Sequence, residues 1–413
     1  CGLWAVVTPQ PWYSPQYIIP MAGMLINNAL TGIAPAVNML VEHLDTRKDH
    51  VSMLLSFGAT PCEAAWPAFT ATFRQAMIPA INGMNVIGLV SIPGMMTGQI
   101  LGGSSPETAA DYQIVITVLI SGCQCMAVLS ICFLSIASLF DRRGRLVSER
   151  FQKNTWFTVG SLFSVDTWKR CCARRKDFPL LEVTTANCPT SPLHLKAERK
   201  DGSDATVIMD IDLTSTLANE RPVQAKFSLK SREIACILGP SGIGKSTLLK
   251  FICDLAYPGN ASSMTLNGTS YEKINPTKWR RDVLYVHQGA SKLAGTPQEF
   301  VETVESLKAR RGLPRLDVLP FMEALGLSES FLHKPWDHFS GGEAQRMMVA
   351  ISLSTKPPVI LFDEPTSALD DGGKVMFEQL VSSLTWHCCI LFVSHDESQV
   401  GRVASSVWRL VEK

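Results

Sequence analysis

Long uncharged stretches alternate with short charged ones over the first third of the chain. Residues 17–41, 75–106 and 113–140 contain no Asp, Glu, Lys or Arg. Each is long enough to cross a hydrocarbon core of about 30 Å as a helix that rises about 1.5 Å per residue. Soluble helices of this length carry a polar face, which these stretches mostly lack. The pattern predicts three membrane spans in an all-α transmembrane bundle covering residues 1–140.

The charged loops between the stretches indicate their orientation. Residues 42–50 include Arg47 and Lys48, and residues 141–150 carry four arginines, whereas residues 102–112 contain neither Lys nor Arg. Because Lys and Arg collect on the cytosolic side of a membrane, residues 102–112 are expected to face outward. We therefore predict an integral, multi-pass membrane protein whose part beyond residue 140 is cytosolic.

The second stretch is interrupted by Pro79, Pro93 and several glycines. Broken backbone at membrane depth persists only where protein or a water-filled cavity surrounds it. The stretch therefore predicts either a helix that lines a substrate path or a kinked helix that packs through small residues. The sequence leaves both open.

A basic and aromatic connector follows, over residues 141–204. Its arginines and lysines alternate with tryptophans and phenylalanines, which is typical of a segment held at anionic lipid headgroups; a solvated tether is the alternative. Residues 187–204 are rich in Pro, Ser, Gly and charge, and predict a linker.

Beyond residue 205 the pattern predicts an α/β fold. An apolar strand over residues 233–239 leads directly into GPSGIGKST, which matches GxxxxGK[ST] between a strand and a helix. Glycines there let backbone N–H groups surround phosphates, and the helix N-terminus favours negative charge. The predicted phosphate-binding residues are Gly239, Pro240, Ser241, Gly242, Ile243, Gly244, Lys245, Ser246 and Thr247.

Further motifs exclude a simple kinase or GTPase. VILFDEP ends a buried strand with Asp363, for Mg²⁺, and Glu364, for the attacking water. FSGGEAQR, at residues 339–346, is expected to open a helix and so to form a second phosphate-binding N-terminus. Another apolar strand ends at His395.

Composition narrows the class of partner. A net charge of +1 gives no reason to expect a nucleic-acid partner, and only 18% of residues are charged, which fits a chain partly embedded in lipid. The twelve cysteines show no CxxC spacing, so reduced thiols are expected. The chain begins with Cys1, and we expect further sequence upstream of it.

The first part resembles a known permease family. The runs IPMAGMLINNAL, LLSFGATPCEAAWPAF and PGMMTGQILGG occur in the order found in bacterial iron-export ABC permeases, and plant aluminium-tolerance permeases are similar. This resemblance implies further spans upstream. It also implies that LSFGATPCEAA is the coupling helix through which such permeases touch their ATPase; an ordinary amphipathic connector is the alternative.

The second part, residues 205–413, resembles the ABC ATPase family in the order of its motifs. The resemblance implies ATP and Mg²⁺ as cofactors, with Lys245 on the β- and γ-phosphates and Ser246, Gln288 and Asp363 near Mg²⁺. It implies catalytic roles for Glu364, His395 and Gln288. A second cassette's nucleotide would be capped by the segment Ser340, Gly341, Gly342 and Glu343, with Asp370 close by. An aromatic residue that stacks on adenine is absent from residues 205–226.

These observations predict a multi-domain chain: a transmembrane permease (1–140), a juxtamembrane linker (141–204) and an ABC cassette (205–413). The predicted function is ATP-driven transport by a dimer with a second copy or a related half-transporter. By resemblance, the transported solute is a metal ion such as iron, moved outward. The alternatives are a sugar-nucleotide transporter, or a soluble or regulatory ATPase that gates rather than pumps.

Overall fold

A computed structural model describes residues 15–86, 94–103, 105–147, 193–199, 207–216, 222–259, 262–288, 293–384 and 388–412. The chain divides into two compact units. The first contains residues 1–47, 65–139 and 147–177, and the second contains residues 48–64, 140–146 and 178–413. Each unit is described separately below.

Four helices form the described part of the first unit. They are α2 (Pro15–Thr46), α4 (Pro61–Val86, whose first residues belong to the second unit), α5 (Gly94–Leu101) and α6 (Pro106–Leu139). Helices α2 and α6 pack together, and a Cβ atom at Gly32 would lie only 2.9 Å from the Gln124 side chain. The small residue therefore lets the two backbones approach, as is common between membrane helices.

Two helices in the described residues are long and apolar enough to cross a membrane by length and composition, at Ala22–Thr46 and Ala109–Leu139. They coincide with the first and third predicted spans. The second predicted span, 75–106, is divided between α4 and α5, and residues 87–93 lie outside the described part of the chain. Helix α4 carries Pro67 and Pro79 within it, and it includes the charged residues Glu63 and Arg74. Two candidate spans are therefore found where the sequence predicted three.

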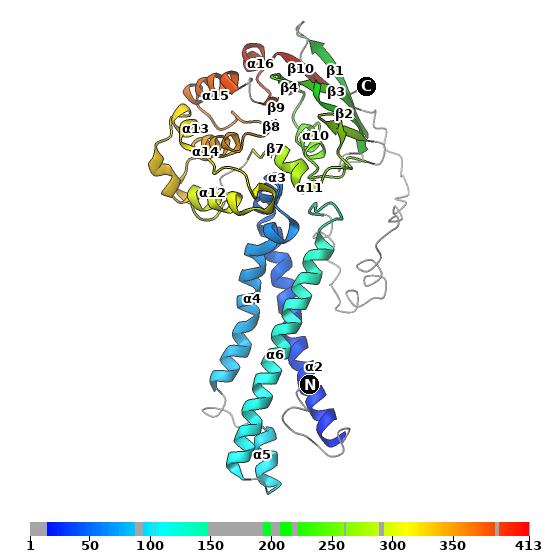
Figure 1. The fold of residues 1–413 in the computed structure, drawn as a ribbon, viewed down its shortest axis with the longest axis vertical. Coiled ribbons are helices and arrows are strands. Elements are labelled where there is room, and N and C mark those ends of the chain that lie inside the picture. Colours follow the sequence, from blue (N-terminus) through cyan, green and yellow to red (C-terminus); the bar gives the residue numbers. More distant parts are fainter. Residues whose placement is uncertain are drawn as a thin grey trace. The chain divides into compact units, whose positions relative to one another are not determined.

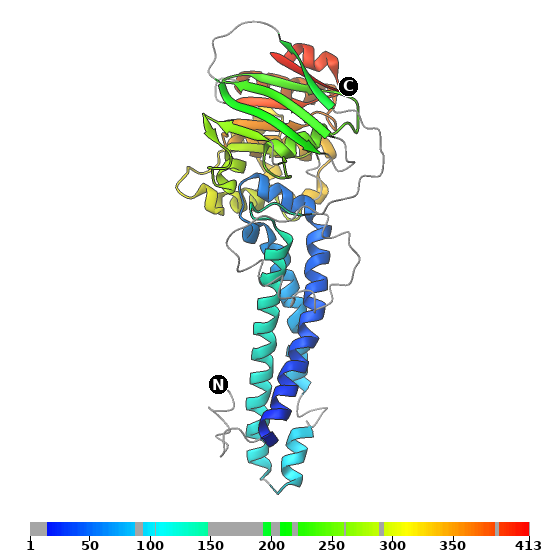
Figure 2. The same cartoon turned by 90° about the vertical axis from the view of Figure 1, so that its right-hand side faces the viewer.

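The second unit is built on one mixed sheet of ten strands, in the order β6-β5-β2-β3-β1-β10-β4-β9-β8-β7. The strands are β1 (Leu193–Arg199), β2 (Val207–Thr216), β3 (Pro222–Lys230), β4 (Ile234–Leu238), β5 (Ser263–Leu266), β6 (Thr269–Ser270), β7 (Val283–Val286), β8 (Val359–Asp363), β9 (Cys389–Val393) and β10 (Ser406–Glu412). Figures 1 and 2 show this sheet from two sides.

Strands β10, β4, β9, β8 and β7 run parallel to one another. Every residue of β4, β8 and β9 is buried, which explains why these segments read as continuous apolar runs. Strands β2, β3, β5 and β6 form an antiparallel half beside them. The predicted α/β class is confirmed.

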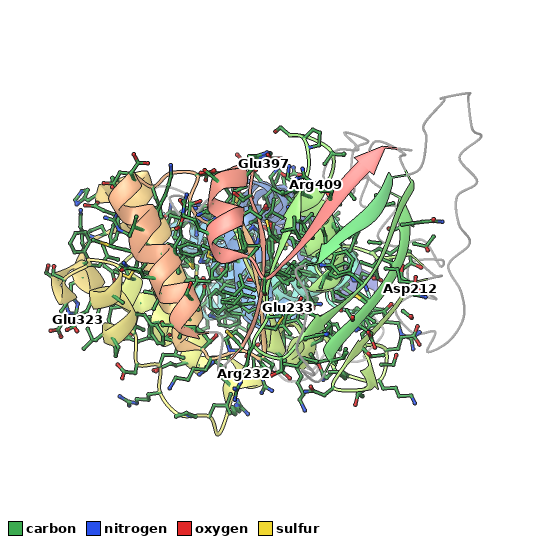
Figure 3. All side chains as sticks on the ribbon, turned by 90° about the horizontal axis from the view of Figure 1, so that it is seen from above. Asp212, Arg232, Glu233, Glu323, Glu397 and Arg409 are labelled. Carbon is green, nitrogen blue, oxygen red and sulfur yellow. The ribbon has the colours of Figure 1, made fainter. Side chains whose placement is uncertain are left out.

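Helices complete the second unit (Figure 1). They are α3 (Lys48–Ser56), α10 (Lys245–Ile252), α11 (Pro276–Asp282), α12 (Pro297–Ser306), α13 (Leu319–Ala324), α14 (Gly341–Ser354), α15 (Asp371–Leu384) and α16 (Glu397–Val403). Helix α16 is tied to β10 by an ion pair of 3.0 Å between Arg409 and Glu397 (Figure 3). All cysteines in the described residues are free, and Cys236, Cys253, Cys388 and Cys389 are buried in this unit.

The predicted linker requires a correction. Strand β1 lies within residues 187–204 and pairs with β10 along its whole length, from Leu193 opposite Glu412 to Arg199 opposite Ser406. The cassette sheet therefore begins before the predicted boundary at 205. The stretch LHLKAER alternates apolar and polar residues, as a half-buried strand does, but the Pro, Ser and Gly around it dominated the composition.

The junctions at 140 and in 48–64 also differ from the predicted boundaries. Residues 48–64 and 140–146, placed with the permease or linker by sequence, belong to the same compact unit as the cassette. Two arginines of the predicted headgroup-binding connector, Arg143 and Arg145, form ion pairs with Asp254 of the cassette instead. The connector beyond residue 147 up to β1 lies outside the described residues.

Gly58 offers a test of how closely residues 48–64 fit the cassette. Its φ is +90°, and an added Cβ would lie 2.6 Å from the Thr277 carbonyl oxygen. Gly58→Ala is expected to lower the thermal unfolding midpoint of the purified protein. The new Cβ would clash with the Thr277 carbonyl oxygen, and a positive φ is also unfavourable for alanine.

Gly268→Ala is the matched control, since Gly268 also has a positive φ (+74°) but an added Cβ would meet nothing within 4 Å. That substitution should cost only the strain, about 1–2 kcal/mol. Equal destabilisation by the two variants would show that Gly58 is not in close contact with α11.

Candidate nucleotide-binding site

The GPSGIGKST segment connects β4 to α10. Gly242 and Gly244 have φ values of +76° and +106°, a region that side chains disfavour, so both positions require glycine. Gly244 is the N-cap of α10 and no side chain caps this helix. The first backbone N–H groups of α10 are therefore directed toward whatever the loop binds, as in other phosphate-binding helices.

A pocket of about 570 Å³ lies over this loop. Its lining residues are Ser241, Gly242, Gly244, Lys245, Ser246, Thr247, Gln288, Glu364 and His395. They follow the carboxyl ends of β4, β7, β8 and β9, the edge at which parallel sheets bind ligands. The structure thus unites the predicted loop with all three predicted catalytic side chains. The lining residues include no Phe, Tyr or Trp.

Two adjacent carboxylates occupy different environments at the end of β8. Asp363 is buried and accepts hydrogen bonds from the Ser246 hydroxyl (2.9 Å) and the Tyr285 hydroxyl (2.7 Å). Burial, followed by the charge of Asp363, raises the pKa of Tyr285 well above its usual range, so this phenol stays a donor. Asp363 is therefore fixed beside the loop serine.

Glu364 points into the pocket. It accepts a hydrogen bond from the Gln288 amide (2.9 Å) and contacts the His395 ring. Its φ of 48° is unusual for a residue other than glycine, and the Gln345 side chain donates to its carbonyl oxygen at 2.8 Å. The same Gln345 accepts from the Ala368 N–H at 3.1 Å. Gln345 thus holds the turn that aims the Glu364 carboxylate.

Lys245 lies folded over the loop. Its ammonium donates to the carbonyl oxygens of Gly239 and Pro240, both at 2.8 Å. Burial lowers the pKa of Lys245, while the carboxylates of Glu364 and Asp363 oppose that effect. The cation therefore stands next to two carboxylates without a direct ion pair to either, because its bonds go to neutral carbonyls.

The remaining predicted site residues lie apart from the pocket lining. Ser340 caps α14 in a capping box with Glu343, whose pKa is lowered first by the Ser340 N–H. A Cβ at Gly342 would lie 2.8 Å from the Ala368 carbonyl oxygen, so this helix start is packed against the segment before α15. Asp370 accepts from the Gly373 N–H at 3.0 Å. Gly341 shares this helix start.

Sequence reasoning missed two positioning residues, Tyr285 and Gln345. Tyr285 lies three residues before Gln288 and Gln345 lies within FSGGEAQR, but their partners come from other strands and loops. A polar group in an otherwise apolar strand was the only available signal for Tyr285.

Helix α3 reaches the site through His287. The His287 ring lies beside the backbone of Ser52, and α3 packs on β7. Burial lowers the pKa of His287 to about 4, the nearby Lys250 charge acting in the same direction. His287 directly precedes Gln288, which lines the pocket and donates a hydrogen bond to Glu364. Helix α3 therefore contacts the residue next to Gln288.

Comparisons with known proteins agree with this division. Residues 1–140 match the family described as an uncharacterised protein family, UPF0014, and residues 223–367 match the ABC transporter family. The second part is similar to the probable iron export ATP-binding protein FetA of Escherichia coli K12, with 32% identity over 42% of this chain and 78% of the relative.

The first part is similar to two membrane proteins. The UPF0014 membrane protein slr1647 of Synechocystis is 40% identical over 29% of this chain and 46% of its own length. The probable iron export permease protein FetB of E. coli K12 is 31% identical over 34% of this chain and 54% of its own length. The chain spans about half the length of these permease relatives.

The pocket and the strand order define a P-loop ATPase of the ABC class. The chain belongs to the ABC transporter family and joins a UPF0014 permease domain to an ABC ATPase cassette. The resemblances drawn from the sequence are confirmed at this level.

His287 predicts a pH dependence of stability. Its folded pKa of about 4 lies below the ordinary 6.5, so between these values the unfolded chain binds a proton that the partly buried ring does not. Stabilisation present above pH 6.5 is therefore lost as the pH falls toward 4, by about 3 kcal/mol.

His287→Gln should remove this part of the loss in unfolding measurements between pH 7 and 4. His338→Gln, at an exposed histidine, should behave like the unchanged protein. A His287→Gln protein with the same pH slope as His338→Gln would contradict the assignment.

Proposed function

We propose that the protein is an ATP-driven membrane transporter in which the UPF0014 part conducts the solute and the cassette hydrolyses ATP. The observation that carries the proposal is the pocket that unites the GPSGIGKST loop with Gln288, Glu364 and His395. Two long apolar helices in the same chain supply the membrane part.

The geometry supports a role for each pocket residue. Lys245 and the loop N–H groups bind the phosphates, and Glu364 accepts the proton of the attacking water. Gln288 and His395 position that carboxylate through the contacts described above. The reaction gains from donors arranged before the phosphoryl charge develops.

Ser246 and Asp363 fit a magnesium ion. Their side-chain oxygens lie 2.9 Å apart and are ligands of the hard type that Mg²⁺ prefers, and Gln288 adds a third oxygen to the same pocket. When bound, the ion would neutralise charge on the β- and γ-phosphates.

A second cassette completes the proposed site. Ser340, Gly341, Gly342 and Glu343 start α14 outside the pocket lining of their own cassette. We place them, with Asp370, on the nucleotide of a partner, which is a second copy of this chain or a related half-transporter. The partner surface is then polar and rich in backbone N–H groups, as an anion requires.

Residues 48–64, which begin with α3, carry the coupling between the two parts. Besides the contact of His287 with Ser52, the Lys308 N–H donates to Glu63 at 3.0 Å, and Phe57 and Phe300 meet edge to face at 5.5 Å. The segment predicted as a coupling helix, LSFGATPCEAA, thus contacts the cassette through Phe57 and Glu63, which supports this role over that of a simple connector.

The proposed solute is a metal ion, and the named relatives favour iron moved outward. The described residues contain no group of three His, Cys, Asp or Glu side chains suited to hold a metal. Accumulation of ferrous iron by inside-out vesicles should therefore be measured with ATP and with a non-hydrolysable analogue. Iron should accumulate with ATP but not with the analogue. Equal accumulation with both nucleotides would indicate a gated channel instead.

Glu364→Gln should reduce ATP turnover by about 100-fold or more, because the general base is lost, while ATP binding survives. Phosphate release and nucleotide binding measure the two effects. Glu397→Gln, at an exposed carboxylate on α16, is the control and should leave turnover unchanged. Unchanged hydrolysis in Glu364→Gln would refute its catalytic role.

Lys245→Ala should weaken ATP binding by roughly 10- to 100-fold, the value of a hydrogen bond to a charged group. Binding of a fluorescent ATP analogue measures it. Lys226→Ala, at a largely exposed lysine paired with Asp212, should bind as the unchanged protein does. Equal affinities for the two variants would exclude Lys245 from the phosphate site.

A further inference from the structure

A short hairpin, Phe140–Leu146, follows directly after α6 and belongs to the cassette unit. Its ends pair in an antiparallel bridge between Phe140 and Leu146. The Asp141 N–H donates to the Arg145 carbonyl at 2.9 Å, and Gly144 forms the turn with a φ of +72°. A Cβ at Gly144 would lie 2.9 Å from Pro61, so the turn fits closely against residues 48–64.

The hairpin binds the end of α10 opposite the phosphate loop. There the Leu255 N–H donates to the Lys250 carbonyl (2.9 Å) and the Asp254 N–H to that of Phe251 (3.2 Å), with Asp254 at a φ of 63°. This is the helix ending that usually takes glycine or asparagine at the left-handed position. Here the position holds a carboxylate that is completely buried.

Two arginines of the hairpin supply the counter-charge for Asp254. Arg143 donates through Nε to one carboxylate oxygen at 2.9 Å, and Arg145 donates through Nε to the other at 2.9 Å. Arg143 also donates to the Tyr271 carbonyl at 3.1 Å and lies over the Tyr271 ring. A completely buried carboxylate is stable only with such partners.

A third arginine joins the hairpin to the cassette backbone. Arg280 of α11 is fully buried, donates through Nε to the Asp254 carbonyl at 3.3 Å, and contacts the Arg143 carbonyl through Nη2. The hairpin is thus bound through both its side chains and its backbone. Arg142, in the same turn of the hairpin, is exposed. The contacts with the cassette are therefore specific to Arg143 and Arg145 and do not follow from the positive charge of the turn alone.

We propose that this hairpin is a second coupling element, which links α6 to the nucleotide-binding helix α10 of its own chain. The link rests on the proposed function and is separate from the α3 contact at His287. One end of α10 carries Lys245 and Ser246, and the other holds the hairpin through Asp254. A shift of α10 on nucleotide binding would therefore move residue 140, the first residue after α6.

Two variants each remove one side of this contact. Asp254→Gly removes the carboxylate and places the residue best suited to the left-handed position, and a combined Arg143→Gln and Arg145→Gln variant removes the other partners. Arg142→Gln is the matched control within the hairpin. All three should keep basal ATP hydrolysis within about twofold, because none of these residues lines the pocket.

Docking is tested first by limited trypsin digestion of the intact protein in lipid nanodiscs. Cleavage after Arg143 and Arg145 should rise at least several-fold in Asp254→Gly, with cleavage after Arg142 as the internal reference. Unchanged protection of Arg143 and Arg145 from trypsin would show that Asp254 does not hold the hairpin in place.

Coupling is then measured by hydrogen–deuterium exchange in the Glu364→Gln background, with and without ATP and Mg²⁺. Exchange at the end of α6 and in the hairpin should change with nucleotide, should keep that change in Arg142→Gln, and should lose it in Asp254→Gly and the double variant. A change retained in those two variants would overturn the inference.

The α3 peptide separates this inference from the proposed function. If α3 responds to nucleotide while the end of α6 never does, the hairpin is not a coupling element and this inference fails alone. If neither segment responds although ATP binds, coupled transport fails as well.

Discussion

The parallel register of β4, β9, β8 and β7 is the constraint on which the site depends. Because these strands point the same way, the segments that follow them meet at one edge: the phosphate loop after β4, Gln288 after β7, Glu364 at the end of β8 and His395 after β9. Apolar residues on both faces fix that register, since each of β4, β8 and β9 is buried throughout. Apart from Asp363, the last residue of β8, these buried strands position the chemical groups of the site without supplying any of them.

The cassette also buries several charged side chains. Asp254 and Arg280 are both fully buried and lie where residues 140–146 and α11 meet the end of α10. Asp363 is buried beside the phosphate loop. In each case the polar group has a defined set of partners from distant parts of the chain, so breaking one contact leaves a charge without compensation.

The sequence predicted the residues of the nucleotide site better than the residues and the strand that hold them in position. The loop from Gly239 to Thr247 and the residues Gln288, Glu364 and His395 follow from local motifs, and each motif fixes its own backbone. Tyr285 and Gln345 were missed because their roles depend on partners far away in sequence. Strand β1 was missed for the same reason: its pairing with β10 joins residues more than two hundred positions apart, and its surroundings resemble a linker.

The place of β10 in the sheet has a consequence for synthesis. Strand β10 separates β1 from β4. Among the strands that the structure describes, it alone joins the half formed by β6, β5, β2, β3 and β1 to the half formed by β4, β9, β8 and β7. The ribosome must therefore release residues 406–412 before the two halves can unite. Until then, the nascent cassette exposes two unpaired sheet edges, a state that favours association with other chains and makes chaperone protection valuable.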